Sequence, residues 1–190
     1  MITLGYQTPD SWTQNAIENM DEFLLDHAAC ERKASSMAMS MVAHYPDKPE
    51  LVKMMINLAL EELNHFKQVM KIILKRKLVL PPDYKDPYVN GFRAYIRKPK
   101  DEYFLDRLLV AGIIEARGEE RFKLISEALP EGPMKKFYHN IAVSEARHHE
   151  LFIELAEIYF PKDEVMKRCD ELVAIEAKII SSCEHLPTVH

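Results

Sequence analysis

Two Glu-x-x-His motifs contain the residue types best suited to chemistry in this chain of 190 residues. Glu62 and His65 form the first motif, and Glu145 and His148 form the second. Residues three apart share one face of a helix, so the carboxylate and the imidazole of each motif can reach the same metal ion. A single motif of this kind is a weak signal, and its weight depends on what surrounds it.

A further glutamate precedes each motif at nearly the same distance. Glu31 lies 31 residues before Glu62, and Glu115 lies 30 residues before Glu145. Each half of the chain therefore contains a Glu, then about 30 residues, then Glu-x-x-His. This is the ligand pattern of di-iron and di-manganese four-helix proteins, in which two helices each give one Glu and two give Glu-x-x-His. The repeat predicts a metal site formed by Glu31, Glu62, His65, Glu115, Glu145 and His148.

The donor atoms of this predicted site indicate which metals it would bind. Four carboxylates bring four negative charges to two divalent ions, which nearly balances them, and paired metal ions lie ~3.5–4 Å apart. Oxygen and imidazole ligands without thiolate suit iron or manganese better than copper(I) or structural zinc. We therefore expect two iron ions, with manganese as the alternative.

Other carboxylates close to the motifs could compete as ligands. Glu119 lies one helical turn after Glu115, and Glu61 and Glu120 are also near. The 30-residue spacing favours Glu115 over Glu119, and Glu61 lies one residue off the apolar stripe of its helix.

Two histidines and a glycine beside the motifs are also open to two interpretations. His27 precedes Glu31 by one turn and fits either a core histidine or a side chain that supports a ligand. His149, next to His148, would face a neighbouring helix or solvent. Gly118 would either open space for O2 or substrate beside the metals or let two helices pack closely.

Five stretches have the spacing of amphipathic helices, and none resembles a strand. They span about residues 11–44, which a break near Asn19 would divide, 50–77, 101–129, 134–160 and 162–183. In the first four, an apolar stripe is interrupted near its middle by the proposed ligands. Buried together, these carboxylates would cost many kcal/mol unless a cation compensated them. The stripe of the fifth helix would bury Val165, Cys169, Leu172, Ile175 and Ile179.

The lengths of the connections predict how the helices are arranged. About five residues join the first helix to the second and the third to the fourth, so each pair should form an antiparallel hairpin. The link over residues 78–100 could extend ~75 Å, beyond the ~40 Å length of a 27-residue helix, so it can cross from one end of a bundle to the other. We expect an all-α, ferritin-like four-helix bundle with one long crossover and an additional C-terminal helix, in a single domain spanning residues 1–190.

The crossover region is basic, although the whole chain has a net charge of −5. Residues 67–107 contain 11 Lys and Arg against 5 Asp and Glu. Positive charge interleaved with aromatic rings suits an unpaired nucleotide of a folded RNA, although rings in a crossover can instead pack on the bundle. The expected RNA contacts are Lys85, Arg93, Arg97 and Lys98. The rings interleaved with the basic residues of this region are Tyr84, Tyr88, Phe92, Tyr95 and Tyr103.

Composition excludes several classes of protein. The chain is 47% hydrophobic and 29% charged, which is unlike a disordered chain. It lacks an apolar run of about 18 residues and a basic, apolar leader, so we expect no membrane span and no signal peptide. Three cysteines without a Cys-x-x-Cys pair suggest a reducing compartment. These features together predict a cytoplasmic protein.

Four segments of the chain resemble one known family. They are HAACERKAS around Glu31, EELNHF around Glu62 and His65, IIEARGEERF around Glu115, and SEARHHELF around Glu145 and His148. The chain resembles the bacterial tRNA 2-methylthio-isopentenyl-adenosine hydroxylases, ferritin-like di-iron monooxygenases, over about residues 15–160.

The resemblance implies a reaction. The isopentenyl tail of the modified adenosine beside the anticodon of tRNA would be hydroxylated with O2 and two electrons from a separate reductase. By the same resemblance, the six residues of the Glu and Glu-x-x-His repeat would hold the two irons. RNA contact would be confined to the crossover and the end of the second helix, and its affinity would fall steeply with salt.

Three other functions fit a site of this kind. A ferritin-like ferroxidase would oxidise Fe(II) and assemble into a shell, and a di-manganese catalase would release O2 from peroxide. A non-catalytic bundle would bind no metal and would keep its fold after Glu62→Ala, but the buried carboxylates make this the least favoured. The ligand set alone does not distinguish hydroxylation, iron oxidation and peroxide disposal.

Overall fold

The computed structural model describes residues 2–190, within which all regular structure is helical. The helices are α1 (Asp10–Glu18), α2 (Met20–His44), α3 (Pro49–Lys75), α4 (Pro87–Gly91), the 3-10 helix η1 (Phe92–Ala94), α5 (Lys100–Ala128), α6 (Pro133–Tyr159) and α7 (Lys162–Ser182). The bounds of the five long stretches lie within two residues of those expected, and a turn at Asn19 separates α1 from α2. These residues form two compact units.

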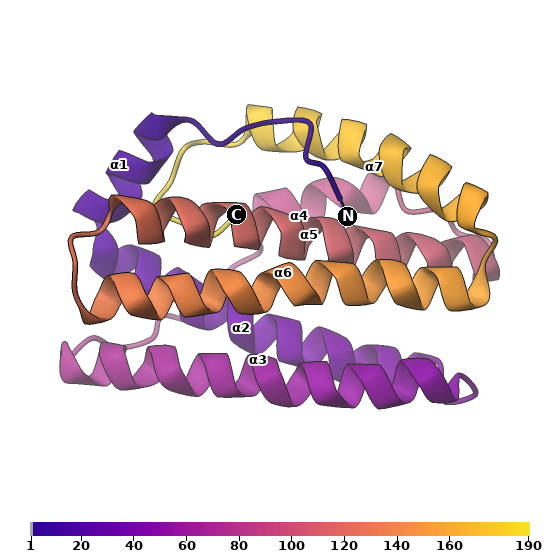
Figure 1. Cartoon of the computed structure of the whole chain (residues 1–190), viewed down its shortest axis with the longest axis horizontal. Coiled ribbons are helices and arrows are strands. Elements are labelled where there is room, and N and C mark those ends of the chain that lie inside the picture. Colours follow the sequence, from indigo (N-terminus) through magenta and orange to yellow (C-terminus); the bar gives the residue numbers. More distant parts are fainter. Residues whose placement is uncertain (1) are drawn as a thin grey trace. The chain divides into compact units, whose positions relative to one another are not determined.

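One unit comprises residues 15–84 and 186–189, and its main feature is the hairpin of α2 and α3. The two helices run side by side in opposite directions (Figure 1). Residues 45–48 connect them, and Pro49 begins α3, where its missing N–H is not needed. Apolar side chains such as Leu24, Met55 and Leu58 are almost fully buried. Across the hairpin, the Ser35 hydroxyl donates a hydrogen bond of 2.8 Å to the Ala59 carbonyl.

The other unit comprises residues 2–14, 85–185 and 190, and it contains the hairpin of α5 and α6 (Figure 1). α7 follows after a tight turn and packs on α5. A Cβ added to Gly112 would lie 3.1 Å from the Phe152 Cβ and 3.2 Å from the Ile2 Cδ1, which is tighter than most Cβ contacts, so the neighbours pack closely against this glycine.

The crossover contains two short helices that were not expected from the sequence pattern. The Asp86 carboxylate accepts hydrogen bonds from the backbone N–H groups of Tyr88 and Val89 and thereby caps α4, while Pro87 occupies its first turn. Tyr88 and Phe92 are buried, so these two rings pack into the protein and are not available to stack on a base. Of the five expected rings, Tyr84, Tyr95 and Tyr103 are exposed.

The buried stripe of α7 is also shifted from the predicted one. Val165, Cys169 and Leu172 are buried as expected, but Glu176 and Ile180 replace Ile175 and Ile179. The cause is an ion pair. Glu176 is buried because Arg117 of α5 reaches it, with Arg117 Nε 2.8 Å from Glu176 Oε1.

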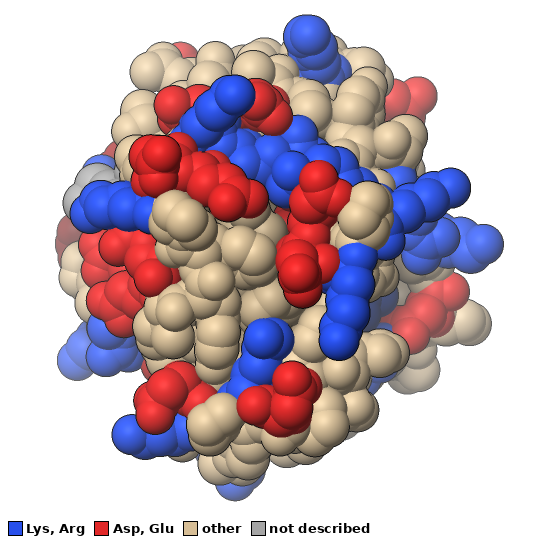
Figure 2. Space-filling view, turned by 90° about the vertical axis from the view of Figure 1, so that its right-hand side faces the viewer, with Lys and Arg blue, Asp and Glu red and all other residues tan. Residues whose placement is uncertain are grey.

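None of the helices in residues 2–190 has both the length and the apolar character needed to cross a membrane. On the face drawn in Figure 2, Lys and Arg side chains are interspersed with Asp and Glu side chains.

Candidate metal centre

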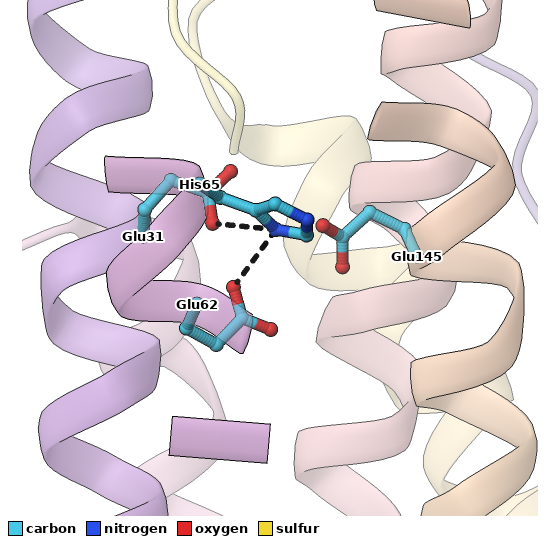
Figure 3. A group of neighbouring side chains, drawn as sticks. All are labelled: Glu31, Glu62, His65 and Glu145. Atoms are coloured by element: carbon cyan, nitrogen blue, oxygen red, sulfur yellow. Dashed lines mark ion pairs between the residues drawn. The ribbon is translucent and has the colours of Figure 1, made fainter. Parts of the chain in front are cut away.

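Three of the six expected ligands meet within the α2–α3 hairpin. Glu31 lies on α2, and Glu62 and His65 lie on α3, with exposed fractions of 4%, 1% and 5%. The His65 Nδ1 lies 3.5 Å from the Glu62 Oε2 and 3.6 Å from the Glu31 Oε2 (Figure 3). One ligand atom from each of the three lies within 4.8 Å of the others. The hairpin thus joins the isolated glutamate to the first Glu-x-x-His motif.

The α5–α6 hairpin gathers the other three. Glu115 lies on α5, and Glu145 and His148 lie on α6. The His148 Nδ1 lies 2.9 Å from the Glu145 Oε2, and one ligand atom from each residue lies within 4.8 Å of the others. Glu145 and His148 are each 2% exposed, and Glu115 is 9% exposed. The second half of the sequence repeat therefore has the same local structure as the first.

Helical spacing explains why each cluster forms. Glu62 and His65, like Glu145 and His148, are three residues apart and project from one face of a helix. Each face also carries buried apolar side chains one turn away, such as Leu58 before Glu62 and Phe152 after His148. The charged groups are therefore held in apolar surroundings by the packing of the hairpins.

Each cluster has donor chemistry that fits one divalent ion. It offers two carboxylates and one imidazole, which can neutralise a doubly charged cation with oxygen and nitrogen donors. Both carboxylates of each cluster are buried, and each would carry a negative charge into apolar surroundings when ionised. A bound cation would remove the cost of burying that charge.

His27 contacts a proposed ligand. Its Nε2 lies 2.5 Å from the Glu31 Oε1, and the side chain is fully buried. Of the two interpretations left open by the sequence, the structure favours support of a ligand. A hydrogen bond from an imidazole to a ligating carboxylate fixes the orientation of that carboxylate.

The competing carboxylates lie elsewhere. Among residues 2–190, the groups of side chains close enough to share an ion do not include Glu61, Glu119 or Glu120. The Glu119 Oε2 lies 3.3 Å from the His149 Nδ1, and Glu120 accepts a hydrogen bond of 2.9 Å from the backbone N–H of Thr8. His149 is 4% exposed, so it faces a neighbouring element rather than solvent. Burial lowers its pKa, although Glu119 opposes the shift.

Gly118 has room for a side chain. A Cβ there would meet only the Phe122 ring, at an ordinary contact distance of 3.7 Å. Close helix packing therefore does not explain this glycine, and the interpretation as open space beside the ligands remains.

The four expected RNA contacts differ in how free their charges are. Lys85, Arg93 and Lys98 are exposed. Arg97 is engaged, because its Nη2 lies 2.7 Å from the Asp106 Oδ1 and its backbone N–H donates to the same carboxylate. An arginine held by a buried carboxylate is less available to a phosphate.

A buried network of charges in α5 and α7 was not predicted from the sequence pattern. Arg117 and Glu176 are fully buried and share two hydrogen bonds, of 2.8 and 3.0 Å. Arg121 is 3% exposed with its guanidinium 4.5 Å from the Trp12 ring, and its burial lowers its pKa to about 10. Two arginines four residues apart on an apolar helix, Arg117 and Arg121, indicate a buried charge network. This pattern does not identify Glu176, 59 residues away, as the partner of Arg117.

Comparisons with known proteins agree with the geometry. The family model described as tRNA-(MS[2]IO[6]A)-hydroxylase (MiaE) matches residues 2–190. A protein of Pseudomonas putida named tRNA 2-(methylsulfanyl)-N(6)-isopentenyladenosine(37) hydroxylase is 38% identical over 180 residues, covering 94% of this chain and 87% of that protein. The protein of the same name from Salmonella typhimurium is 25% identical over 224 aligned positions, covering 92% and 82%.

A solved structure is similar over nearly the whole chain. It is described as protein 43 with aldehyde deformylating oxygenase activity from Synechococcus, and it has a TM-score of 0.91 and 36% sequence identity. The match covers 97% of this chain and 92% of that one. It confirms the expected all-α, ferritin-like fold class. With the family model matching residues 2–190, the chain belongs to the MiaE family of tRNA hydroxylases.

Proposed function

We propose that this protein hydroxylates the isopentenyl group of 2-methylthio-isopentenyl-adenosine next to the anticodon of tRNA. The observation that carries the proposal is the pair of buried clusters, Glu31–Glu62–His65 and Glu115–Glu145–His148, in a chain of the MiaE family. The names of its relatives supply the substrate, and the buried donor sets supply a means of oxygen chemistry.

Two iron ions would be held by the six residues of the two clusters, three from each hairpin. The chemistry that such a pair supplies is the use of O2 and two electrons to insert one oxygen atom into a C–H bond, while the other oxygen leaves as water. A separate reductase would provide the electrons. The balance is one R–H, one O2, two electrons and two protons in, and one R–OH and one water out.

The chain's own side chains would orient the ligands and exclude water. His27 holds the Glu31 carboxylate by its contact of 2.5 Å. Leu58, Leu108, Phe122 and Phe152 are each no more than 3% exposed and supply apolar surroundings. Exclusion of water protects a reactive oxidant from side reactions.

Binding of tRNA would involve the exposed cations of the crossover, in the cytoplasm where the substrate is found. Lys85, Arg93 and Lys98 are the stronger candidates, and Arg97 the weaker, because Asp106 already binds it. Contacts to phosphates make affinity fall steeply as salt rises. Charge reversal at Lys85 and Arg93 should weaken tRNA binding at low salt and reduce that salt dependence.

Nucleoside mass spectrometry tests the proposal. Iron-loaded protein, a chemical reductant and air are incubated with tRNA that contains 2-methylthio-isopentenyl-adenosine. We expect a gain of one oxygen atom on that nucleoside, lost in Glu115→Ala and retained in Glu119→Gln. Absence of product with protein verified to contain iron would overturn the proposal.

A further inference from the structure

The outer face of α3 combines exposed apolar side chains with lysines. Ile56, Leu60 and Leu63 are 40%, 63% and 49% exposed. Lys53 lies on one side of them along the helix, and Lys67 and Lys71 lie on the other. At 100° per residue these six side chains share one face, which we call the Leu60 face.

This face is not used within the chain. The opposite side of α3, with Leu51, Met55, Leu58 and Val69, is buried and forms the core side of the hairpin. Among residues 2–190, no ion pair involves Lys53, Lys67 or Lys71. Adjacent exposed aliphatic side chains rimmed by charges of one sign are typical of a surface that binds a partner.

The Leu60 face lies behind two proposed ligands. Glu62 and His65 project from the buried side of the same helix segment, and Leu63 is adjacent to Glu62 in sequence. A helix with its side chains is ~10–12 Å across, so a partner on this face would be separated from the ligands by about one helix. This places a docked protein close to the proposed metal centre without requiring access to the buried cluster.

We propose that the Leu60 face docks a small acidic electron-transfer protein that supplies the electrons for hydroxylation. This inference rests on the proposed function, because hydroxylation with O2 consumes two electrons, which a separate donor would supply. The required partner would have an apolar centre to cover Ile56, Leu60 and Leu63 and a rim of carboxylates to meet the lysines. Such complementarity raises the rate of encounter and selects the partner.

Charge and shape argue against other occupants. A second copy packed antiparallel on this face would bring Lys53 opposite Lys67 and Lys71, which is repulsive. RNA is bound by aromatic stacking and phosphate contacts, and the centre of this face is aliphatic. A protein with carboxylates around an apolar patch satisfies both parts of the surface.

The test uses a plant-type [2Fe–2S] ferredoxin with its NADPH-dependent reductase as the acidic donor. Isothermal titration measures the affinity of oxidised ferredoxin for the 190-residue chain, with and without iron. One variant, Lys53→Glu with Lys67→Glu, reverses the charges at both ends of the rim, and a second, Leu60→Ser with Leu63→Ser, removes the apolar centre. The matched control is Lys123→Glu with Lys136→Glu, which makes the same change in charge at exposed positions of α5 and α6.

We expect the rim variant to bind ferredoxin about tenfold more weakly at low salt, with the difference closing as salt screens the charges. The centre variant should lose about tenfold at every salt concentration, since apolar contact is not screened. The control should stay within about twofold of the wild type. Circular dichroism and thermal unfolding verify that the variants are folded.

Several results would overturn the inference. One is that the wild type does not bind ferredoxin, and another is that neither variant differs from the control. If the wild type is a dimer in sedimentation and the centre variant is a monomer, the face binds a second copy of the chain. If the rim variant loses affinity for tRNA, the face binds RNA. Binding of wild type, but not the rim variant, to vesicles of anionic lipid would assign it to a membrane.

A separate arm distinguishes this inference from the proposed function. With dithionite as the electron source, the rim and centre variants should form hydroxylated nucleoside at the wild-type rate, and with ferredoxin they should be about tenfold slower. If dithionite yields no product from the wild type, the proposed function fails, and the titrations still show whether ferredoxin binds the Leu60 face. If both electron sources give equal rates in all variants, only the docking proposal fails.

Discussion

Glu115 and Arg117 lie two residues apart on α5, and both are buried, but their surroundings differ. Glu115 lies beside Glu145 and His148, so that two carboxylates accompany one imidazole. Arg117 donates hydrogen bonds to Glu176, to the Tyr6 carbonyl at 2.8 Å and to Glu120. On one face of α5 the Glu115 carboxylate therefore lies near a second carboxylate, and on the other face Arg117 is paired with carboxylates.

The two residues illustrate two ways in which a buried charge can be compensated, by a partner in the chain or by a bound ion. Burial alone would lower the pKa of Arg117, but hydrogen bonds and charge from Glu176 raise it above its ordinary value. This pair is balanced by the chain itself. The carboxylates of the two clusters lie against imidazoles, and we propose that a metal cation compensates their charge.

The largest effect should follow from breaking the balanced pair. Arg117→Met leaves Glu176 buried without its guanidinium, and such a loss costs about 3–5 kcal/mol. Urea unfolding should report this change in the free energy of unfolding. Arg117→Met with Glu176→Leu should restore most of it, and a single variant that loses less than about 1 kcal/mol would contradict the structural role.

Removing a charge from the unbalanced cluster should have the opposite sign. In metal-free protein, Glu115→Gln relieves repulsion with Glu145 and should raise the free energy of unfolding by about 1 kcal/mol. The same variant should lose the stabilisation that iron gives the wild type. Thermal unfolding with and without Fe(II) measures both effects. A metal-free Glu115→Gln protein less stable than the wild type would show that the carboxylate is balanced internally.

Acid should weaken a second balanced group in α5. Burial alone would raise the pKa of Asp106, but hydrogen bonds from Arg168 and Arg97 outweigh it and lower the pKa below its usual value. Because the pKa of Asp106 is lower in the folded than in the unfolded protein, the carboxylate stabilises the fold at pH values above its unfolded pKa of about 4. That stabilisation is lost as the pH falls through the pKa of the folded state. The stability difference between wild type and Asp106→Asn should be constant from neutral pH to about 5 and shrink below about 4 in urea unfolding. A difference independent of pH would contradict this interpretation.

The smallest effects concern two glycines of α5. Gly118→Ala should add about 0.5–1 kcal/mol of stability, because alanine favours helix and the space is open. Gly112→Ala should lose stability, because its Cβ would crowd Phe152 and Ile2. If Gly118 leaves room for substrate, Gly118→Ala will lower hydroxylation without lowering iron content. Equal behaviour of both glycines in thermal unfolding would show that the packing differs from that described.

Local patterns in the sequence predicted the elements well. Apolar spacing, Pro49 and Pro133 at helix starts and the turn at Asn19 are all local signals. The same spacing placed Glu31 near Glu62 and His65, because a short connection forces α2 and α3 together. That all six residues together bind metal stays a prediction.

Features that depend on distant partners were missed. Glu176 enters the core in place of Ile175 only because Arg117, 59 residues earlier, is there to meet it. Asp86 and Pro87 were a local signal for the short helix α4. This helix buries Tyr88, whose hydroxyl donates a hydrogen bond of 3.1 Å to the distant Glu176. A sequence read one helix at a time does not reveal such a pairing.

Iron stoichiometry tests the central claim most directly. Metal analysis and Mössbauer spectroscopy of protein reconstituted with Fe(II) should show two iron ions per wild-type chain, as the six-ligand pattern requires. Glu115→Gln should hold less iron, whereas Glu119→Gln, the same change one turn away, should still hold two. A wild-type protein that binds no iron, or equal loss in both variants, would contradict the assignment of these clusters as a metal centre.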